Sequence, residues 1–178
     1  MELQKVLEAR RSVRKYDAAK KVSKEQVEEL VSAAILAPSW KNSQTARYHV
    51  VLSDETTKKM LSDCLPEFNA KNAEGAALVV TTFVANRAGF NREGQPDNEA
   101  GNGWGFYDLG LHNENFVLKA KEMGLDTLIM GIRDEAKIRE TLQIPEAETI
   151  VSVIALGYSE QNPDMPKRKS PEDIITFH

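Results

Sequence analysis

The segment Ile150–Leu156 limits the possible folds of this chain more than any other feature. Every residue in it except Ser152 is apolar. Successive side chains of a strand point to opposite faces, so an almost continuous apolar run indicates a strand that is buried on both faces. The run Leu78–Phe83 is rich in β-branched residues and indicates a second strand. The sequence therefore predicts a sheet with Ile150–Leu156 in its interior.

Helical periodicity and capping residues predict helices between the strands. Ser23 and Gln26 have the spacing of a capping box, and Pro38 should end this helix at Ala37. Gly124 is suited to end a long helix. The expected helices cover residues 3–10, 23–37, 53–65, 106–124 and 134–142, and the expected strands cover 48–52, 78–83, 127–130 and 150–156. Interleaved helices and about four strands predict one α+β or α/β domain.

Charge and cysteine content argue against several classes of protein. A formal net charge of -4 leaves no broad basic face for nucleic acid. Cys64 is the single cysteine, so no internal disulfide can form. The N-terminus lacks a signal-peptide pattern, and no apolar run reaches the ~20 residues that span a bilayer. We therefore expect a cytoplasmic protein with no nucleic-acid or membrane partner.

The run from Arg10 to Arg14, Arg-Arg-Ser-Val-Arg, is a candidate anion site. Three guanidiniums and a hydroxyl suit a phosphate or another compact anion. If the segment is extended, Ser12 and Arg14 face one side and Val13 faces the core. The alternative is a solvated basic turn. Lys167 and Lys169 form a second basic cluster, which is either an ordinary charged tail or a second arm for the same phosphate.

Two polar segments are further candidates for ligand contact. Pro38–Gln44 lies between a helix and a strand, and its hydroxyls and amides could read the edge of a polar heterocycle or simply form a turn. Residues 86–105 are polar and glycine-rich without periodicity, which is typical of a lid or a disordered loop. The spacing of Gly101, Gly103 and Gly105 does not fit a dinucleotide fingerprint, and these glycines indicate flexibility.

No set of side chains has the spacing of a catalytic or metal centre. His49, His112 and His178 lack the spacing of zinc ligands, and Cys64 lies on an apolar helical stripe without a partner. There is no GxSxG nucleophile elbow. A reaction in this protein would therefore depend on a bound cofactor and not on a metal.

Taken together and in this order, these segments resemble the FMN-dependent nitroreductase family over nearly the whole chain. The resemblance rests on Arg10–Arg14, Ala37–Gln44, Gly124–Asp126 leading to Met130-Gly131, and the basic tail. It implies an α+β fold, with a mostly antiparallel sheet wrapped by helices, in an interlocked homodimer with FMN at the interface. Residues 1–178 would form a single domain, with 86–105 as a lid-like loop and 157–178 as a tail contributing to the cofactor site or the dimer.

By this resemblance, one group of residues holds the phosphate end of FMN. Arg10 and Ser12 would bind the phosphate together with Lys167 and Lys169. Arg11 would lie along the phosphate and the ribityl chain.

A second group would surround the flavin ring. Arg14 would face N1 and the C2 carbonyl, and Asn69 would bond the ring edge. The backbone of Met130 and Gly131 would approach N5 and O4. The residues expected from the opposite subunit are Pro38, Ser39, Trp40 and Asn42.

The chain departs from the family pattern near these positions. Thr45-Ala46 follows Gln44 where family members often have Pro-Trp, Trp40 is bulkier than the usual serine, and Lys41 adds a charge. Asn72 stands where some members carry a lysine near N1, which leaves Arg14 as the main cation at that edge. The residues expected to form the substrate pocket are Trp40, Lys41, Trp104 and Phe106, although the last two could serve only to pack the long helix.

The activity implied by the resemblance is hydride transfer from NADH or NADPH, through flavin N5, to a small acceptor such as a nitroaromatic or a quinone. Both substrates would use the same flavin face in turn, which gives ping-pong kinetics. Negative charge that develops at N1 and the C2 carbonyl would be stabilised by Arg14. The alternatives are another flavin reaction such as reductive dehalogenation, a flavin- or anion-binding protein without turnover, and a helical interaction protein with incidental basic ends.

Overall fold

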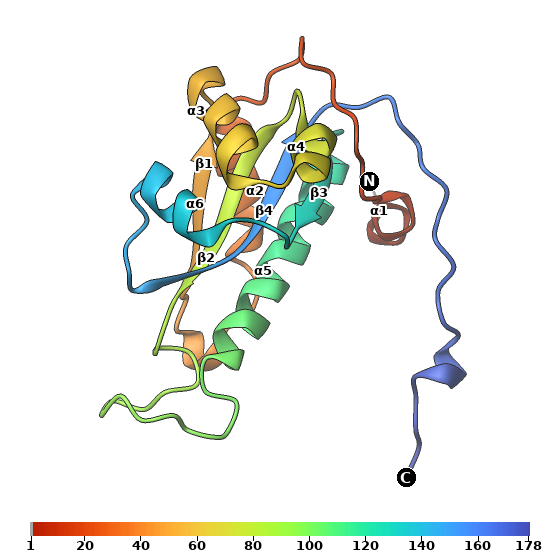
Figure 1. The fold of residues 1–178 in the computed structure, drawn as a ribbon. Coiled ribbons are helices and arrows are strands. Elements are labelled where there is room, and N and C mark those ends of the chain that lie inside the picture. Colours follow the sequence, from red (N-terminus) through yellow and green to blue (C-terminus); the bar gives the residue numbers. More distant parts are fainter. Residues whose placement is uncertain (1) are drawn as a thin grey trace.

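A computed structural model describes residues 2–178 of the chain and is built around one antiparallel sheet (Figure 1). Its strands are β1 Ala46–Val51, β2 Ala77–Val84, β3 Asp126–Met130 and β4 Glu148–Gly157, in the order β1-β2-β4-β3. Each pair of neighbours is antiparallel. The predicted apolar strand is part of β4, which pairs with a strand on each side. The α+β class and the interior position of this strand are therefore confirmed.

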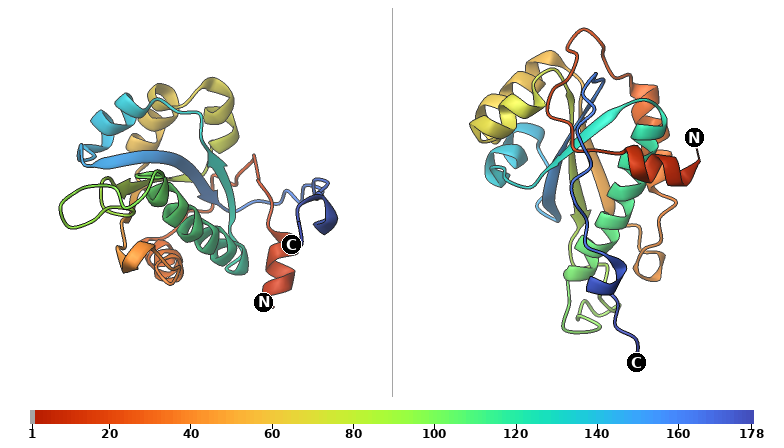
Figure 2. Two further views of the ribbon diagram at one scale, coloured as in Figure 1. Left: turned by 90° about the horizontal axis from the view of Figure 1, so that it is seen from below. Right: turned by 90° about the vertical axis from the view of Figure 1, so that its right-hand side faces the viewer.

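Helices cover both faces of the sheet and make a three-layer arrangement (Figure 2). The helices of the described chain are α1 Leu3–Ala9, α2 Lys24–Ala34, α3 Asp54–Lys59, α4 Glu67–Ala73, α5 Gly103–Glu122 and α6 Glu135–Leu142. Side chains alternate along the central strands, so Val79 and Ile154 pack with α2 and α5 while Leu78 and Val153 pack on the other face. This two-sided burial explains why the central strands are apolar throughout.

Local capping residues set the starts of three helices as the sequence predicts. Ser23 and Gln26 form the expected capping box at α2. Ser53 accepts a hydrogen bond from the backbone N–H of Thr56 at α3, and Asp134 accepts one from Lys137 at α6. Each cap satisfies a backbone N–H that has no partner inside the helix.

Helix ends differ from the prediction more than helix starts. α2 ends at Ala34 and not at Ala37, because the N–H groups of Leu36 and Ala37 bond to carbonyls three residues back and tighten the last turn. The predicted helix over residues 53–65 is α3 followed by a π-helical turn, Met60–Cys64. Helix α4 was not predicted, since its N-cap Pro66 makes no side-chain hydrogen bond that a sequence pattern could reveal.

The predicted lid-like segment is shorter than expected, because α5 begins at Gly103. Gly105 therefore lies inside a helix, and its role is close packing and not flexibility: a Cβ there would lie 2.3 Å from the ring of Phe83. The chain after β4 runs as an extended tail with one short 3-10 turn, Pro171–Asp173 (Figure 1). No helix within residues 2–178 is long and apolar enough to cross a bilayer.

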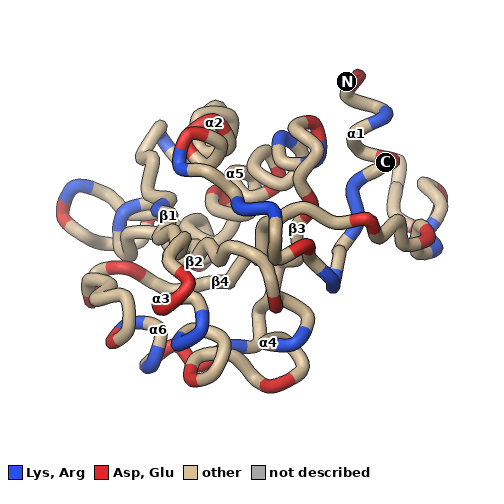
Figure 3. Tube along the Cα trace, turned by 90° about the horizontal axis from the view of Figure 1, so that it is seen from above, with Lys and Arg blue, Asp and Glu red and all other residues tan. Residues whose placement is uncertain are grey.

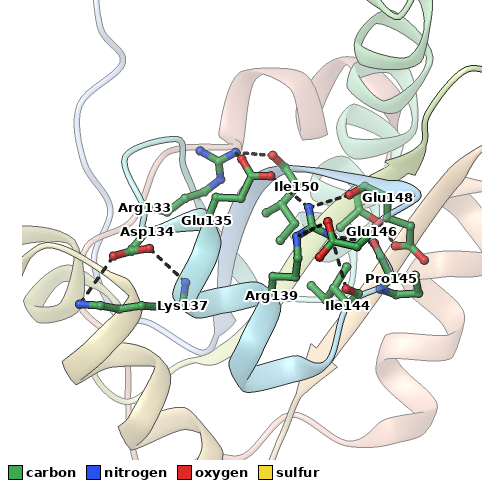
Figure 4. A network of polar contacts seen from close by, with 11 residues as sticks. Arg133, Asp134, Glu135, Lys137, Arg139, Ile144, Pro145, Glu146, Glu148 and Ile150 are labelled. Atoms are coloured by element: carbon green, nitrogen blue, oxygen red, sulfur yellow. Dashed lines mark hydrogen bonds and ion pairs between the residues drawn. The ribbon is translucent and has the colours of Figure 1, made fainter.

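Helix α6 is fastened to β4 by two arginines (Figure 4). Arg139 donates to the carbonyls of Glu148 and Pro145, at 2.9 and 2.7 Å. Arg133 donates to the carbonyl of Ile150. Glu148 and Ile150 belong to β4, so these bonds link α6 and the segment just before it to that strand.

The Glu148 side chain connects three neighbouring strands. Its Oε2 lies 2.7 Å from His49 Nε2 on β1 and accepts a hydrogen bond from Thr82 on β2. Burial works to raise the pKa of Glu148, but the hydrogen bonds from Thr82 and His49 outweigh it and hold that pKa below its ordinary value. The carboxylate is therefore more stable in the folded protein than in the unfolded chain.

Candidate functional site

The arginine segment lies along the free edge of β3. The backbone N–H of Val13 donates to the Thr127 carbonyl at 3.0 Å, and Ser12 forms a parallel bridge with Thr127. Val13 is fully buried, while Ser12 and Arg14 are exposed, as the alternation of an extended segment predicts. Tyr16 is also buried, and its hydroxyl donates to the Val13 carbonyl at 3.0 Å. The segment is therefore anchored through Val13 and presents its polar side chains outward.

Two of the arginines are already oriented by the backbone. Arg11 donates from Nη1 to the carbonyls of Glu8 and Arg10, at 2.5 and 2.8 Å, while its Nε is buried without a partner in the described chain. Arg14 donates to the Ser12 carbonyl at 3.2 Å. Its own N–H donates to Gln161 Oε1 at 3.1 Å, which ties the segment to the start of the tail. The buried Nε–H of Arg11 thus stays without an acceptor in the described chain.

The residues expected at the ring end meet at the other end of β3. Met130 is buried, and Gly131 is exposed directly after the strand. Asn69, on α4, is 7% exposed and donates from Nδ2 to the carbonyl of Ile132 at 2.9 Å. Gly131 lies four residues beyond Thr127, so Gly131 and the bridge to the arginine segment are separated by about 13 Å along β3. An elongated ligand with an anionic end and a polar ring could contact both.

The tail is joined to the arginine segment near its start, but its two lysines are not bonded to that segment within the described residues. The tail is held near its start, where Ser159 Oγ donates to the carbonyl of Lys15 at 2.7 Å. Lys167 and Lys169 are exposed, and among residues 2–178 no hydrogen bond or ion pair connects either one to Arg10 or Ser12.

The loop containing Pro38, Ser39, Trp40 and Asn42 lies at the opposite end of α5 (Figure 1). The backbone N–H of Trp40 donates to Asp108 Oδ2 at 2.8 Å, and Ser39 Oγ accepts from the N–H of Gln44 at 3.1 Å. The arginine segment adjoins β3, which begins after α5 ends. A 20-residue helix such as α5 is about 30 Å long. One chain therefore does not bring this loop to the arginine segment.

Three of the four residues expected in the substrate pocket meet beside this loop. The rings of Trp40 and Trp104 have centroids 4.4 Å apart. Lys41 pairs with Asp97 at 2.7 Å, and its Nζ lies 5.5 Å from the centre of the Trp40 ring. Phe106 is separate: it packs edge-on against Phe83 at 4.9 Å and is 49% exposed. Two residues of helix rotate a side chain by about 200°, which directs Phe106 away from Trp104.

Asp108 is the residue of this region that sequence analysis missed. It is 3% exposed, and burial raises its pKa above the ordinary value although the Trp40 N–H and His112 oppose the shift. A charged side chain on the apolar face of a helix was the available signal, because such a residue needs a partner. Its partner is 68 positions away in the chain, which no local pattern indicates.

The fold and the site together define a class of protein: a helix-covered antiparallel sheet with an arginine-rich segment along one edge strand. The sequence model of the nitroreductase family matches residues 7–158. The chain belongs to the nitroreductase family.

Individual relatives agree with this assignment. A protein of Archaeoglobus fulgidus, whose name carries both NADH dehydrogenase and NAD(P)H nitroreductase, is 30% identical over 164 residues, which cover 90% of this chain and 87% of that protein. The NADPH-flavin oxidoreductase of Vibrio harveyi is 30% identical over 173 residues, covering 94% of this chain and 69% of that protein. A crystal structure from Exiguobacterium sibiricum, described as a nitroreductase in complex with FMN, matches with a TM-score of 0.82 at 22% identity, covering 100% of this chain and 98% of that one. The nitroreductase-like fold is thereby confirmed.

Proposed function

We propose that this protein is an FMN-dependent oxidoreductase that transfers hydride from NADH or NADPH to a small acceptor such as a nitroaromatic or a quinone. The observation that carries the proposal is the arrangement along β3. Exposed Ser12 is bridged to Thr127 near one end of the strand, and exposed Gly131 lies about 13 Å away at the other. An elongated cofactor with a phosphate and a polar ring fits this spacing. The names of the relatives support the same cofactor and the same electron donor.

The arginine segment is assigned to the phosphate end of FMN. Arg10 and Ser12 bind the phosphate, and Arg11 lies along it with the Nε that has no partner in the described chain. Lys167 and Lys169 complete this end of the site from the exposed tail. A buried N–H without an acceptor is unfavourable, so an anion beside Arg11 would stabilise the folded protein as well as the complex.

Residues around the end of β3 are assigned to the flavin ring of FMN. Bound FMN supplies the capacity to accept a hydride at N5 and to release it to a second substrate. Arg14 places a cation at the N1 and C2 carbonyl edge and stabilises negative charge that develops there. Asn69, whose Nδ2 is occupied by the Ile132 carbonyl, keeps Oδ1 for the ring edge. The backbone of Met130 and Gly131 borders N5 and O4.

A second copy of the chain completes the site. Pro38, Ser39, Trp40 and Asn42 are separated from the arginine segment of their own chain by the length of α5, so they can reach the ring only from a partner. The tail also carries apolar side chains without cover: Ile174 is 71% exposed and Phe177 is 91% exposed. Such side chains are more stable against another surface than in water. We therefore propose a homodimer in which each subunit lends its 38–44 loop to the other.

The remaining elements of the proposal concern the acceptor. Trp40, Lys41 and Trp104 border the acceptor pocket next to the lid-like loop. Phe106 is assigned to the outer edge of the same pocket. The nicotinamide nucleotide and the acceptor occupy this pocket in turn, which gives ping-pong kinetics. The single-domain organisation, with the tail assisting the cofactor site, and the cytoplasmic location stay predictions.

The colour of the purified protein tests the proposal directly. A yellow protein that NADH or NADPH bleaches without oxygen, and that a nitroaromatic or quinone turns yellow again, supports it. A colourless protein that takes up no FMN on titration refutes it. A yellow protein that neither nucleotide bleaches would identify a flavin-binding protein without turnover.

Arg14→Ala tests the assigned charge role separately from cofactor binding. The variant should retain FMN, reduce it more slowly and lower its potential. A charge contact of about 1.4 kcal/mol corresponds to roughly 30 mV for a two-electron couple. Lys58→Ala, which removes an exposed cation from α3, is the control and should leave the potential unchanged. An unchanged potential in Arg14→Ala would remove the N1 role.

A further inference from the structure

A hollow of about 820 Å³ separates the 38–44 loop from the turn at residues 86–94. Trp40, Lys41 and Ser43 line one side of it, and Arg87, Phe90 and Arg92 are among the residues on the other. The hollow lies beside the aromatic pair of Trp40 and Trp104 and is bounded by the lid-like loop. No role assigned above involves the side of the hollow that contains Arg87, Phe90 and Arg92.

The hollow has more hydrogen-bond donors than the protein itself satisfies. Trp40 Nε1 and Ser43 Oγ are buried without a partner in the described chain. Arg87 and Arg92 form no ion pair and no side-chain hydrogen bond with any residue of 2–178. Indole and guanidinium nitrogens only donate, so the unmet need is for an acceptor. Arg87 and Arg92 are exposed, so their N–H groups are free to bind an acceptor that enters the hollow.

The charge of the hollow favours an anion. Lys41 is neutralised by Asp97 at 2.7 Å. Of the other charged residues that line it, Arg87 and Arg92 outnumber Glu93. Figure 3 shows Lys and Arg interspersed with Asp and Glu on most elements, and the whole chain has a net charge of -4. A local cation surplus in an acidic protein is suited to a phosphate, which two guanidiniums can bind through paired N–H groups.

The walls of the hollow also include aromatic rings. Trp40 and Phe90 line it from opposite sides, and planar rings of this kind stack on bases. Under the proposed function, Trp40 also borders the flavin of the partner subunit. A ligand in the hollow that reached past Trp40 would therefore approach the place where hydride is delivered.

We propose that this hollow binds the phosphate-bearing adenosine end of the nicotinamide dinucleotide. Arg87 and Arg92 contact the phosphate, and Trp40 and Phe90 border the base and the ribose. This inference rests on the proposed function and adds the residues that select the electron donor. The phosphate is either the 2′-phosphate that distinguishes NADPH or the diphosphate bridge that both nucleotides share.

Binding measured without reduction tests the inference. The purified FMN-loaded protein is titrated calorimetrically with adenosine, AMP and adenosine 2′,5′-bisphosphate. These three ligands carry no phosphate, a 5′-phosphate, and a 2′-phosphate together with a 5′-phosphate. At least one phosphorylated compound should bind more tightly than adenosine. Arg87→Gln and Arg92→Gln should each weaken that binding by about three- to tenfold, as for partly exposed charge-assisted hydrogen bonds, and leave adenosine binding unchanged. Lys58→Gln removes an equal charge elsewhere and should have no effect.

The pattern of affinities decides between the phosphates. If the bisphosphate binds more tightly than AMP, the 2′-phosphate is the ligand and the enzyme should prefer NADPH. If the two bind equally and more tightly than adenosine, the diphosphate bridge is the ligand and neither nucleotide is preferred. Equal binding of all three compounds, or normal binding by both arginine variants, overturns the inference. If benzoate competes with AMP as strongly as the bisphosphate does, the inference is also overturned, because the hollow would then bind any aromatic anion.

The two proposals fail in different ways. These probes do not reduce flavin, so their binding is independent of turnover. A protein that binds FMN and is bleached by NADH, yet shows no phosphate-dependent affinity, loses only this inference. A protein without FMN loses the proposed function, and the same titration still reports on the hollow.

Discussion

Gly105 and Gly110 lie on the same helix, and replacing each with alanine should change stability in opposite directions. A Cβ on Gly105 would lie 2.3 Å from two ring carbons of Phe83, which is far inside van der Waals contact. Phe83 is 1% exposed, and its ring packs edge-on against Phe106 at 4.9 Å. At Gly110, which is exposed, a Cβ would meet nothing within 4 Å.

Two opposing terms set the expected magnitudes. Alanine is more favourable than glycine in a helix interior by about 0.8–1.0 kcal/mol, since glycine loses more backbone freedom on folding. Overpacking a filled core costs about 1–3 kcal/mol. Gly110→Ala should therefore stabilise the protein by about 1 kcal/mol. Gly105→Ala should destabilise it by about 0.5–2 kcal/mol, because the contact with Phe83 exceeds the helix gain in the first turn of α5.

Urea unfolding followed by far-UV circular dichroism measures both variants. Their difference reports mainly the contact with Phe83, because both substitutions place alanine in α5. Phe83→Leu in the Gly105→Ala background should recover part of the loss, since the leucine side chain removes the ring atoms in conflict. Equal stabilisation by Gly105→Ala and Gly110→Ala would show that the Phe83 ring moves freely, and would refute the packing argument.

Two carboxylates give further predictions. The pKa of Glu148 is lowered on folding, so its contribution to stability is present above the ordinary value of 4.5 and is lost as the pH falls through the lowered value. Glu148→Gln should lower the free energy of unfolding by about 1–2 kcal/mol near neutral pH, because the hydrogen bonds of His49 and Thr82 lose a charged acceptor, and the difference should shrink in acid. Urea titrations of the Glu148→Gln variant and the unchanged protein, near neutral pH and in acid, check this. The same difference in the free energy of unfolding at both pH values would contradict it. Asp108→Ala should destabilise the protein by about 1–3 kcal/mol by leaving the Trp40 N–H unpaired. Asp108→Asn keeps an acceptor and removes a buried charge whose pKa is raised, so it should be neutral or stabilising at neutral pH. Equal thermal unfolding temperatures for the two Asp108 variants would show that the Trp40 bond contributes nothing.

Features that depend on neighbours in the sequence were predictable. The caps at Ser23, Ser53 and Asp134 act over three residues, so their spacing alone reveals them. The alternation of Ser12, Val13 and Arg14 was equally local, and it places the buried and exposed side chains as the structure does. The apolar run of β4 predicted its interior position because burial on both faces leaves a compositional signature.

Features that depend on distant contacts were not predictable. Gly105 looks like part of a flexible glycine-rich segment until the ring of Phe83 is placed against it. Asp108 has no sequence pattern that names Trp40 as its partner. The hollow lined by Arg87 and Arg92 also needs the fold, because its two sides are separated by more than forty residues in the chain. Helix α4 was missed for a different reason, since it begins without a capping side chain.

The backbone of the 38–44 loop has a consequence for how such proteins can be recombined. Lys41, Asn42 and Gln44 have φ angles of 47°, 53° and 48°. This left-handed region costs most residues about 1–2 kcal/mol, although asparagine adopts it more readily than lysine or glutamine. The loop sequence does not favour this shape by itself, and the bond from Trp40 to Asp108 helps to hold it. A graft of residues 38–44 onto another scaffold should therefore relax to a different shape. Segments 38–44 and 97–108 form one transferable module, and chimeras should exchange them together.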